Sequence, residues 1–266
     1  MSEGTAPPLL GLGHFTFLDL PPRELVRLAA RTGYSAVGLR LHPAAPGGLA
    51  YVLPPGSREM QAVLRDKGVS VYDIETVVVN AAFDPEALKP VFASSAELGA
   101  KRLNICADDP DRGRLVANYA QLCELAADHG MGVDVECMKW RVIDTLGKCV
   151  EIVEASGMAN AGVLVDALHL ARCGGTPDDV AKIPPHLIPS AQLCDAPAAA
   201  PVGTEATVAE ARAGRLPPGR GGLPLKALIA ALPEQVIYSV EIPMAGKEAP
   251  DVRAKTILDA TMALFA

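Results

Sequence analysis

The sequence predicts an α/β protein of the (β/α)8-barrel class, in which eight parallel strands are surrounded by helices. Short apolar runs rich in β-forming residues alternate about eight times with longer amphipathic runs, as in parallel strands joined by helices. An open, doubly wound sheet would show a similar alternation. The barrel is favoured because Gly11-Leu12-Gly13 in the first run lacks the third glycine of a phosphate-binding fingerprint. Polar residues also end several later runs, and a closed barrel gathers strand ends on one rim.

Eight short runs dominated by aliphatic residues are predicted to be the strands. In chain order they are Leu9 to Phe15, Ala36 to Leu41, Val69 to Val77, Arg102 to Cys106, Gly132 to Glu136, Gly162 to Asp166, Ile188 to Cys194 and Val236 to Glu241. Because the alternation is regular over the whole chain, residues 1–266 are predicted to form a single domain.

The runs between the strands have the spacing of amphipathic helices. Apolar residues recur on one face in two of them: Leu115, Tyr119, Leu122 and Ala126, and Ala254, Leu258, Met262 and Phe265. Asp84-Pro85 and Thr176-Pro177 are helix start signals, and Gly68 stands where a helix turns back into a strand. The Pro/Gly/Ala-rich stretch from Ala196 to Gly222 is predicted to be a loop that closes over a substrate.

Composition excludes several classes of function. The 24 Lys and Arg residues are outnumbered by 31 Asp and Glu residues, and no basic block is present, so nucleic-acid binding is not expected. We find neither a signal peptide nor an apolar run of ~20 residues, which argues against membrane insertion and favours the cytoplasm. The six cysteines show no CxxC spacing, which favours packing in a reducing compartment. Whether the chain forms a homo-oligomer is left open.

Metal-binding side chains are predicted at the ends of four strands. Glu136, Asp166 and Glu241 end apolar runs, and Gln192 lies near the end of another, three residues before Asp195. Buried acids repel one another and lose hydration, so their recurrence predicts one neutralising divalent cation. Carboxylate and amide oxygens suit Mg, Mn or Co.

Two further residues near strand ends have alternative interpretations. His169, three residues after Asp166, either contacts substrate and shuttles a proton or orients Asp166. Glu75, near the end of the third strand, is either a substrate-binding residue or part of an ion pair on the rim.

The long loop and the segment after the fifth strand supply candidate cations. Arg212, Arg215 and Arg220 can each clamp a polar substrate group or merely be solvated. Arg215 is preferred for substrate binding because the Pro-Pro-Gly turn after it would fix its direction. Lys139 is a further candidate for contacting substrate.

The segments that carry a family resemblance are VECMKW, LVDALHLARCGG, AQLCDAP, GRLPPGRGGLPL and SVEIP. In these segments the chain resembles the xylose isomerase-like TIM barrel superfamily, in particular its sugar phosphate isomerase/epimerase branch. The resemblance implies that Glu136, Asp166, Gln192 and Glu241 bind the metal. Many epimerases of this family have histidine where this chain has Gln192, and in that respect the chain is similar to some 3-dehydroshikimate dehydratases. Endonuclease IV relatives need more metal-binding histidines than this chain offers.

These residues predict an isomerase or epimerase of a small keto-sugar or sugar phosphate. In such an enzyme Glu136 and Glu241 would transfer a proton through a metal-bound enediolate, with His169 assisting. The alternative is a 3-dehydroshikimate dehydratase-like lyase that begins with the same proton removal and then loses a hydroxyl group. A non-catalytic sugar-binding barrel is the third hypothesis.

Overall fold

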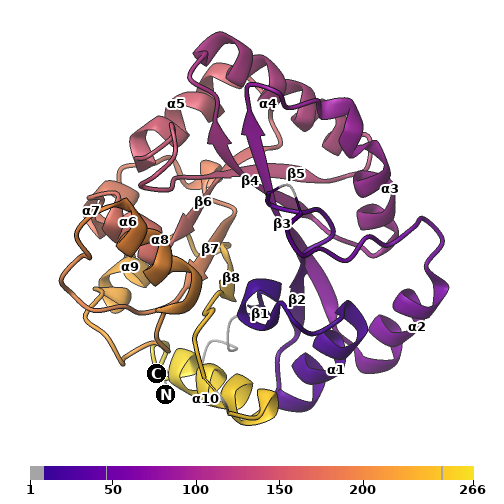
Figure 1. Cartoon of the computed structure of the whole chain (residues 1–266), viewed down its shortest axis with the longest axis vertical. Helices are drawn as coiled ribbons and strands as arrows, with labels where there is room; N and C mark the ends of the chain where they lie inside the picture. Colours follow the sequence, from indigo (N-terminus) through magenta and orange to yellow (C-terminus); the bar gives the residue numbers. More distant parts are fainter. Residues whose placement is uncertain (1–8, 46, 247) are drawn as a thin grey trace.

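The strands close into a barrel (Figure 1). In the computed structural model, which describes residues 9–45, 47–246 and 248–266, each strand lies parallel to its neighbours and β8 pairs with β1. This arrangement confirms the predicted fold class. The strands are β1 (Leu10–Leu12), β2 (Ala36–Leu39), β3 (Ser70–Asn80), β4 (Arg102–Asp108), β5 (Gly132–Glu136), β6 (Ala161–Asp166), β7 (Ser190–Leu193) and β8 (Ile237–Val240).

Helices cover the outside of the barrel (Figure 1). The α-helices are α1 (Pro22–Thr32), α2 (Arg58–Lys67), α3 (Lys89–Glu97), α4 (Arg112–Ala127), α5 (Leu146–Ser156), α6 (Ala167–Arg172), α7 (Pro177–Val180), α8 (Thr204–Ala213), α9 (Leu225–Ala231) and α10 (Pro250–Met262). Short 3-10 segments are η1 (His14–Phe17), η2 (Pro85–Leu88) and η3 (Pro185–Leu187).

Local sequence explains how several helices begin and end. The Asp84 carboxylate caps η2 by accepting a hydrogen bond from the backbone N–H of Glu86, and Thr176 forms a capping box with Asp179 at α7. Gly68 ends α2 in the left-handed conformation, with φ of 64°. The stretch 196–222 is predicted from the sequence to be a loop that closes over a substrate. It instead contains α8, because TEATVAEARA is rich in good helix formers.

An ion pair fills the barrel toward the amino ends of its strands. Arg102 Nε on β4 donates to both carboxylate oxygens of Asp134 on β5, at 3.0 Å each, and Ser190 Oγ donates to Asp134 Oδ2 at 2.8 Å. Gly132 is needed beside Arg102, because a Cβ at this position would overlap the guanidinium group. This buried pair belongs to the end of the barrel where residues typically serve stability.

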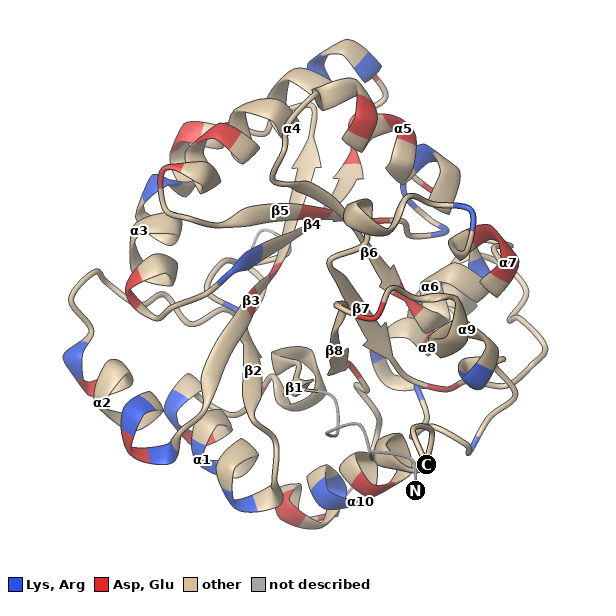
Figure 2. Cartoon of the chain, turned by 180° about the vertical axis from the view of Figure 1, so that it is seen from behind, with Lys and Arg blue, Asp and Glu red and all other residues tan. Residues whose placement is uncertain are grey.

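Positions of Lys and Arg are interspersed with positions of Asp and Glu along the outer helices (Figure 2). All six cysteines are buried free thiols, which agrees with the packing role expected from their spacing. Within the described ranges, none of the helices combines the length and apolar character that crossing a membrane requires.

His14 connects β1 to β2 through its ring. Its Nδ1 accepts a hydrogen bond from the backbone N–H of Arg40 at 2.9 Å, so its Nε2 carries the proton and donates to the Leu20 carbonyl at 2.8 Å. The ring also stacks on Tyr51, with the centroids 5.2 Å apart. Burial is the main cause that lowers the pKa of His14. The folded protein therefore holds a neutral imidazole here.

We expect stability to decrease as the pH falls through the range where an unfolded histidine titrates, ~6.5. The unfolded chain takes up a proton there, whereas folded His14 stays neutral until its lowered pKa is reached. NMR titration of the ring signal should give a midpoint below ~6.5, with the exposed His186 as the reference signal. A midpoint at or above the ordinary value would contradict this assignment.

Candidate active site

The four predicted metal-binding residues are buried at one rim of the barrel. Glu136 and Asp166 are the last residues of β5 and β6, and Glu241 directly follows β8. Gln192 on β7 is the registered partner of Asp166, which places the two strand ends at the same level. Gln192 Nε2 donates to Glu241 Oε2 at 3.1 Å. The parallel direction of the strands therefore brings together residues that lie far apart in the sequence.

Arg215 lies among these acids rather than on an open loop. Only 1% of it is exposed, and its Nη1 donates to Asp166 Oδ2 at 2.6 Å and to the backbone oxygen of Glu241 at 3.1 Å. Its Nη2 lies 3.1 Å from Glu241 Oε1 and 3.2 Å from His169 Nε2. The guanidinium is thus a positive charge held within the acidic cluster, a position that the sequence did not predict.

Asp195 fixes the chain segment that carries Arg215. Its backbone pairs in both directions with Leu216, at 2.7 and 2.8 Å. Its carboxylate accepts hydrogen bonds from four backbone N–H groups: those of Ala196, Gly219, Gly221 and Leu223. Asp195 therefore organises the loop instead of facing the acids, and in doing so it helps to hold Arg215 in place.

His169 is positioned by Asp166. The Asp166 Oδ1 caps α6 by accepting the backbone N–H of His169 at 2.8 Å, which explains the three-residue spacing. The imidazole packs edge-on against Trp140, with centroids 5.3 Å apart, and its Nε2 lies 3.8 Å from Glu136 Oε1. The three-residue spacing therefore caps α6 and brings the imidazole to the rim, and both alternatives for the role of His169 stay predictions.

The donor set fits a divalent cation. Glu136, Asp166 and His169 each offer a ligand atom, and these atoms lie within 4.8 Å of one another. Among the described residues, Glu136 Oε1 and Gln192 Oε1 are buried without a hydrogen-bond partner. Buried oxygens without donors are rare in folded proteins, and hard cations bind such oxygens. The carboxylate of Glu241, by contrast, already has Gln192 and Arg215 as partners.

The pKa values reflect burial and mutual repulsion. Burial, then the charges of Asp166 and Glu241, raises the pKa of Glu136 well above its ordinary value. Burial and neighbouring acids raise the pKa of Glu241 to about 7, against the opposing effect of Arg215. Burial alone would raise the pKa of Asp166, but Arg215 and His169 outweigh it and the pKa is lowered. Burial lowers the pKa of His169 to about 4.

The two remaining predicted substrate-binding residues, Glu75 and Lys139, have different surroundings. Glu75 lies near Glu241, and its charge helps to raise the pKa of Glu241. Glu75 is buried, and its carboxylate accepts the backbone N–H groups of His14 at 2.6 Å and Phe15 at 3.0 Å and pairs with Arg40 at 3.3 Å. These contacts match the ion-pair alternative for Glu75. Lys139 is exposed and lines a neighbouring pocket instead of the central one.

A pocket of about 120 Å³ opens over the rim. Glu136, His169, Arg215 and Glu241 line it, together with residues that the sequence did not single out. The latter include Phe15, Arg40, Trp140 and Arg141. Arg40 directly follows β2, so a polar residue at a strand end was an available signal for it. Trp140 and Arg141 lie on the segment after β5, for which spacing gave no comparable signal.

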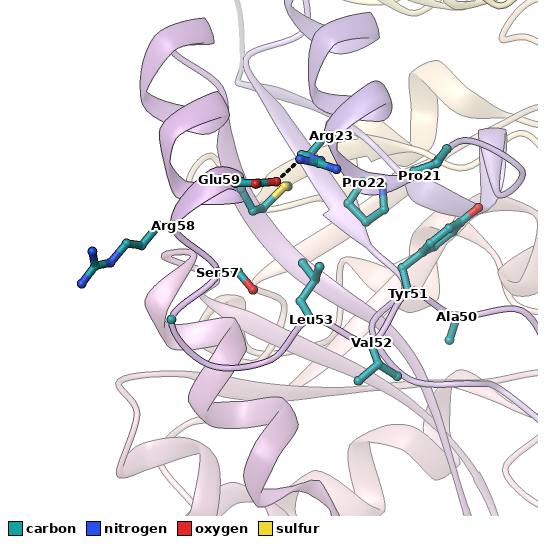
Figure 3. A pocket seen from close by; sticks show the side chains of 12 residues that line it. Pro21, Pro22, Arg23, Ala50, Tyr51, Val52, Leu53, Ser57, Arg58 and Glu59 are labelled. Atoms are coloured by element: carbon teal, nitrogen blue, oxygen red, sulfur yellow. Dashed lines mark hydrogen bonds and ion pairs between the residues drawn. The ribbon is translucent and has the colours of Figure 1, made fainter.

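A wider hollow of about 740 Å³ lies elsewhere, at the starts of α1 and α2 (Figure 3). Its lining includes Tyr51, Leu53 and an ion pair between Arg23 and Glu59. It contains none of the predicted site residues. The candidate active site is therefore identified by the titratable residues that line the smaller pocket and not by pocket volume.

A closed parallel barrel with buried acids at the carboxyl ends of its strands has the architecture of a (β/α)8-barrel enzyme. The chain belongs to the xylose isomerase-like TIM barrel family, whose sequence profile matches residues 26–261. The resemblance drawn from the strand-end motifs is thereby confirmed. Membership of this family does not by itself identify the reaction.

Known proteins share parts or all of the barrel. A 3-dehydroshikimate dehydratase from Pseudomonas aeruginosa is 31% identical over 129 residues, which are 48% of this chain and 20% of that protein. The chain spans about one fifth of the length of the curated relatives that it matches.

Two solved structures show the same fold at low sequence identity. The IolI protein with a bound zinc atom matches with a TM-score of 0.80 and 18% identity, over 96% of this chain and 97% of that one. A D-allulose 3-epimerase from Methylomonas sp. matches with a TM-score of 0.72 and 15% identity, over 97% and 98% of the two chains. At these identities the likeness establishes the fold alone.

Proposed function

We propose that the protein is a divalent-metal-dependent isomerase or epimerase of a small keto-sugar or sugar phosphate. The observation that carries this proposal is the setting of Glu136. Its carboxylate is buried in the central pocket beside Asp166 and His169, and among the described residues its Oε1 has no hydrogen-bond partner. A positioned carboxylate with a free oxygen can remove a proton from a bound substrate.

Glu136, Asp166, Gln192 and Glu241 are proposed to hold one Mn, Mg or Co ion. When bound, this ion would polarise the substrate carbonyl and make the neighbouring C–H bond easier to deprotonate. The unpartnered oxygens of Glu136 and Gln192 support this assignment. His169 is an additional candidate ligand, because its ring nitrogen belongs to the same cluster.

The two glutamates are proposed to move the proton. They lie on β5 and after β8, so a substrate between them would present opposite faces to them. One glutamate removes the proton beside the carbonyl, the electron pair forms an enediolate, and the other glutamate supplies a proton to this intermediate. Return to the same carbon gives an epimer, and return to the former carbonyl carbon gives an isomer. Arg215 and His169 position the substrate oxygens.

A 3-dehydroshikimate dehydratase-like lyase is the second candidate. It is favoured by Gln192 on β7 and by the 31% identity with the Pseudomonas aeruginosa dehydratase. In this reaction the same proton is removed first. The electron pair then expels a hydroxyl group one carbon further along, which leaves as water after taking a proton from His169 or a glutamate.

A substrate panel separates these functions. The protein with Mn, Mg or Co is incubated in deuterated water with ketoses, their phosphates and dehydroshikimate. We expect isomerisation or epimerisation with deuterium entering beside the carbonyl, followed by NMR. An ultraviolet-absorbing aromatic product formed from dehydroshikimate would instead establish the lyase. Binding without turnover across the panel would support a sugar-binding barrel and contradict both enzymatic proposals.

Metal dependence is tested on the same reaction. We expect a chelator to abolish turnover and Mn, Mg or Co to restore it, because the substrate carbonyl then loses and regains its activating cation. Equilibrium dialysis should show one ion bound per chain. Full activity in the presence of chelator would show that the reaction does not require a metal ion.

A further inference from the structure

The central pocket has two chemically different halves. The half over β5 to β8 carries the lining acids Glu136 and Glu241. The half over β2 to β4 is lined instead by neutral side chains and by two arginines. These are Arg40, which follows β2, and Arg141, which follows β5 but pairs with Asp108 at the end of β4. No carboxylate of the described residues lines this second half.

Arg40 is a buried cation with donors to spare. It is 6% exposed, and its guanidinium lies over the Phe15 ring, 5.1 Å from the ring centroid. Its Nη2 pairs with Glu75 at 3.3 Å, but that carboxylate also accepts two backbone N–H groups. Among the described residues, Arg40 Nε has no partner. A guanidinium carries five N–H donors, so this one is only partly satisfied.

Arg141, like Arg40, is paired with one carboxylate and has an unpartnered Nε among the described residues. Its Nη1 donates to Asp108 Oδ2 at 2.6 Å, and Asp108 Oδ1 accepts the backbone N–H of Val142 at 3.1 Å. Its Nε is buried and has no partner within the described part of the chain. The ion pair therefore orients Arg141 without using all of its donors.

Cys106 on β4 lines the same pocket as the two arginines. Burial raises the pKa of the Cys106 thiol to about 12, and the positive charges of Arg141 and Arg40 both act to lower it. Arg40 and Arg141 both line the one central pocket, and each guanidinium has donors that the described residues do not use. A single ligand group in this pocket can therefore contact both arginines.

We infer that Arg40 and Arg141 form a subsite for an anionic group of the substrate, a carboxylate or a phosphate. Unsatisfied buried donors are costly, and a planar guanidinium matches both kinds of oxyanion with charge-assisted hydrogen bonds. The substrate would then be a hydroxylated ketone that also carries an acid group, with its carbonyl end in the acidic half. This inference rests on the proposed proton-transfer function, because it assigns the remaining end of the same substrate.

Pairs of compounds that differ in one anionic group test the subsite. Calorimetric titration compares shikimate with its methyl ester, and fructose 6-phosphate with fructose; inorganic phosphate is a minimal probe. We expect the charged member of at least one pair to bind more tightly than its neutral partner by about 10-fold or more, from the worth of charge-assisted hydrogen bonds. A preference in the shikimate pair identifies a carboxylate subsite, and one in the fructose pair identifies a phosphate subsite.

Variants localise the effect. Arg141→Gln is expected to weaken binding of the charged compound by about 10- to 100-fold and to leave the neutral partner unchanged. Arg40→Lys keeps a charge opposite Glu75 but loses the planar fork, so it should show a smaller loss of the same kind. The matched control is Arg112→Gln, which removes an exposed arginine at the start of α4 outside the pocket.

The inference is overturned if both members of each pair bind equally, if neither charged compound nor phosphate binds, or if Arg141→Gln weakens neutral and charged compounds alike. Charge-dependent binding without turnover of any panel compound would contradict the proposed function but not the subsite. Turnover of charged and neutral compounds with equal KM would contradict the subsite alone.

Discussion

Glu136→Gln is expected to lower turnover by about 10²–10⁴, the usual worth of general acid–base catalysis, and Glu241→Gln by a similar factor. Glutamine keeps one side-chain oxygen for a cation but cannot accept the proton. Bound metal, measured by equilibrium dialysis, should therefore be largely retained in both variants. Glu136 is the sharper test, because its Oε1 has no partner among the described residues, whereas both oxygens of Glu241 are paired.

Deuterium washout shows which glutamate faces the reacting hydrogen. The variant that removes the base should lose exchange beside the carbonyl, while the other variant should still exchange but fail to complete turnover. Glu151→Gln, an exposed residue on α5, is the control for loss of a carboxylate elsewhere. If both site variants exchange and turn over like the parent protein, the two-glutamate mechanism fails even where the metal is bound.

Arg215→Met is expected to lower the free energy of unfolding by about 3–5 kcal/mol in the presence of a chelator at neutral pH, the usual cost of breaking a buried ion pair. The methionine fills much of the volume, but it leaves the carboxylates of Asp166 and Glu241 buried without their cation. The loss should shrink at acid pH, where protonation removes the uncompensated charges. Urea unfolding measures it directly.

Arg212→Met is the matched control for this experiment. Arg212 lies three residues earlier and is exposed, so its replacement should change stability by less than about 0.5 kcal/mol. Added Mn should stabilise Arg215→Met, because a cation that binds only the folded state shifts the unfolding equilibrium. Equal stability of Arg215→Met and the parent protein in chelator would show that the acids do not depend on Arg215.

The sequence by itself determined the architecture and much of the polar cluster. Alternating apolar and amphipathic runs predicted the barrel because periodicity is a local property of the chain. The clustering of the acids at the ends of the fifth, sixth and eighth strands could be predicted from the sequence, since parallel strands in a barrel end on one rim. The three-residue spacing of Asp166 and His169 was visible in the sequence, and the structure shows that it is the spacing of a helix cap.

Only the tertiary structure decided how charges are paired around that cluster. Arg215 lies among the acids because the backbone of Asp195 holds its segment, and Glu75 is engaged by His14 and Phe15 from another strand connection. Lys139 turns outward while Arg40 and Arg141 face the pocket. Loop paths set these contacts through hydrogen bonds between residues distant in the sequence, and neither periodicity nor spacing along one segment contains that information.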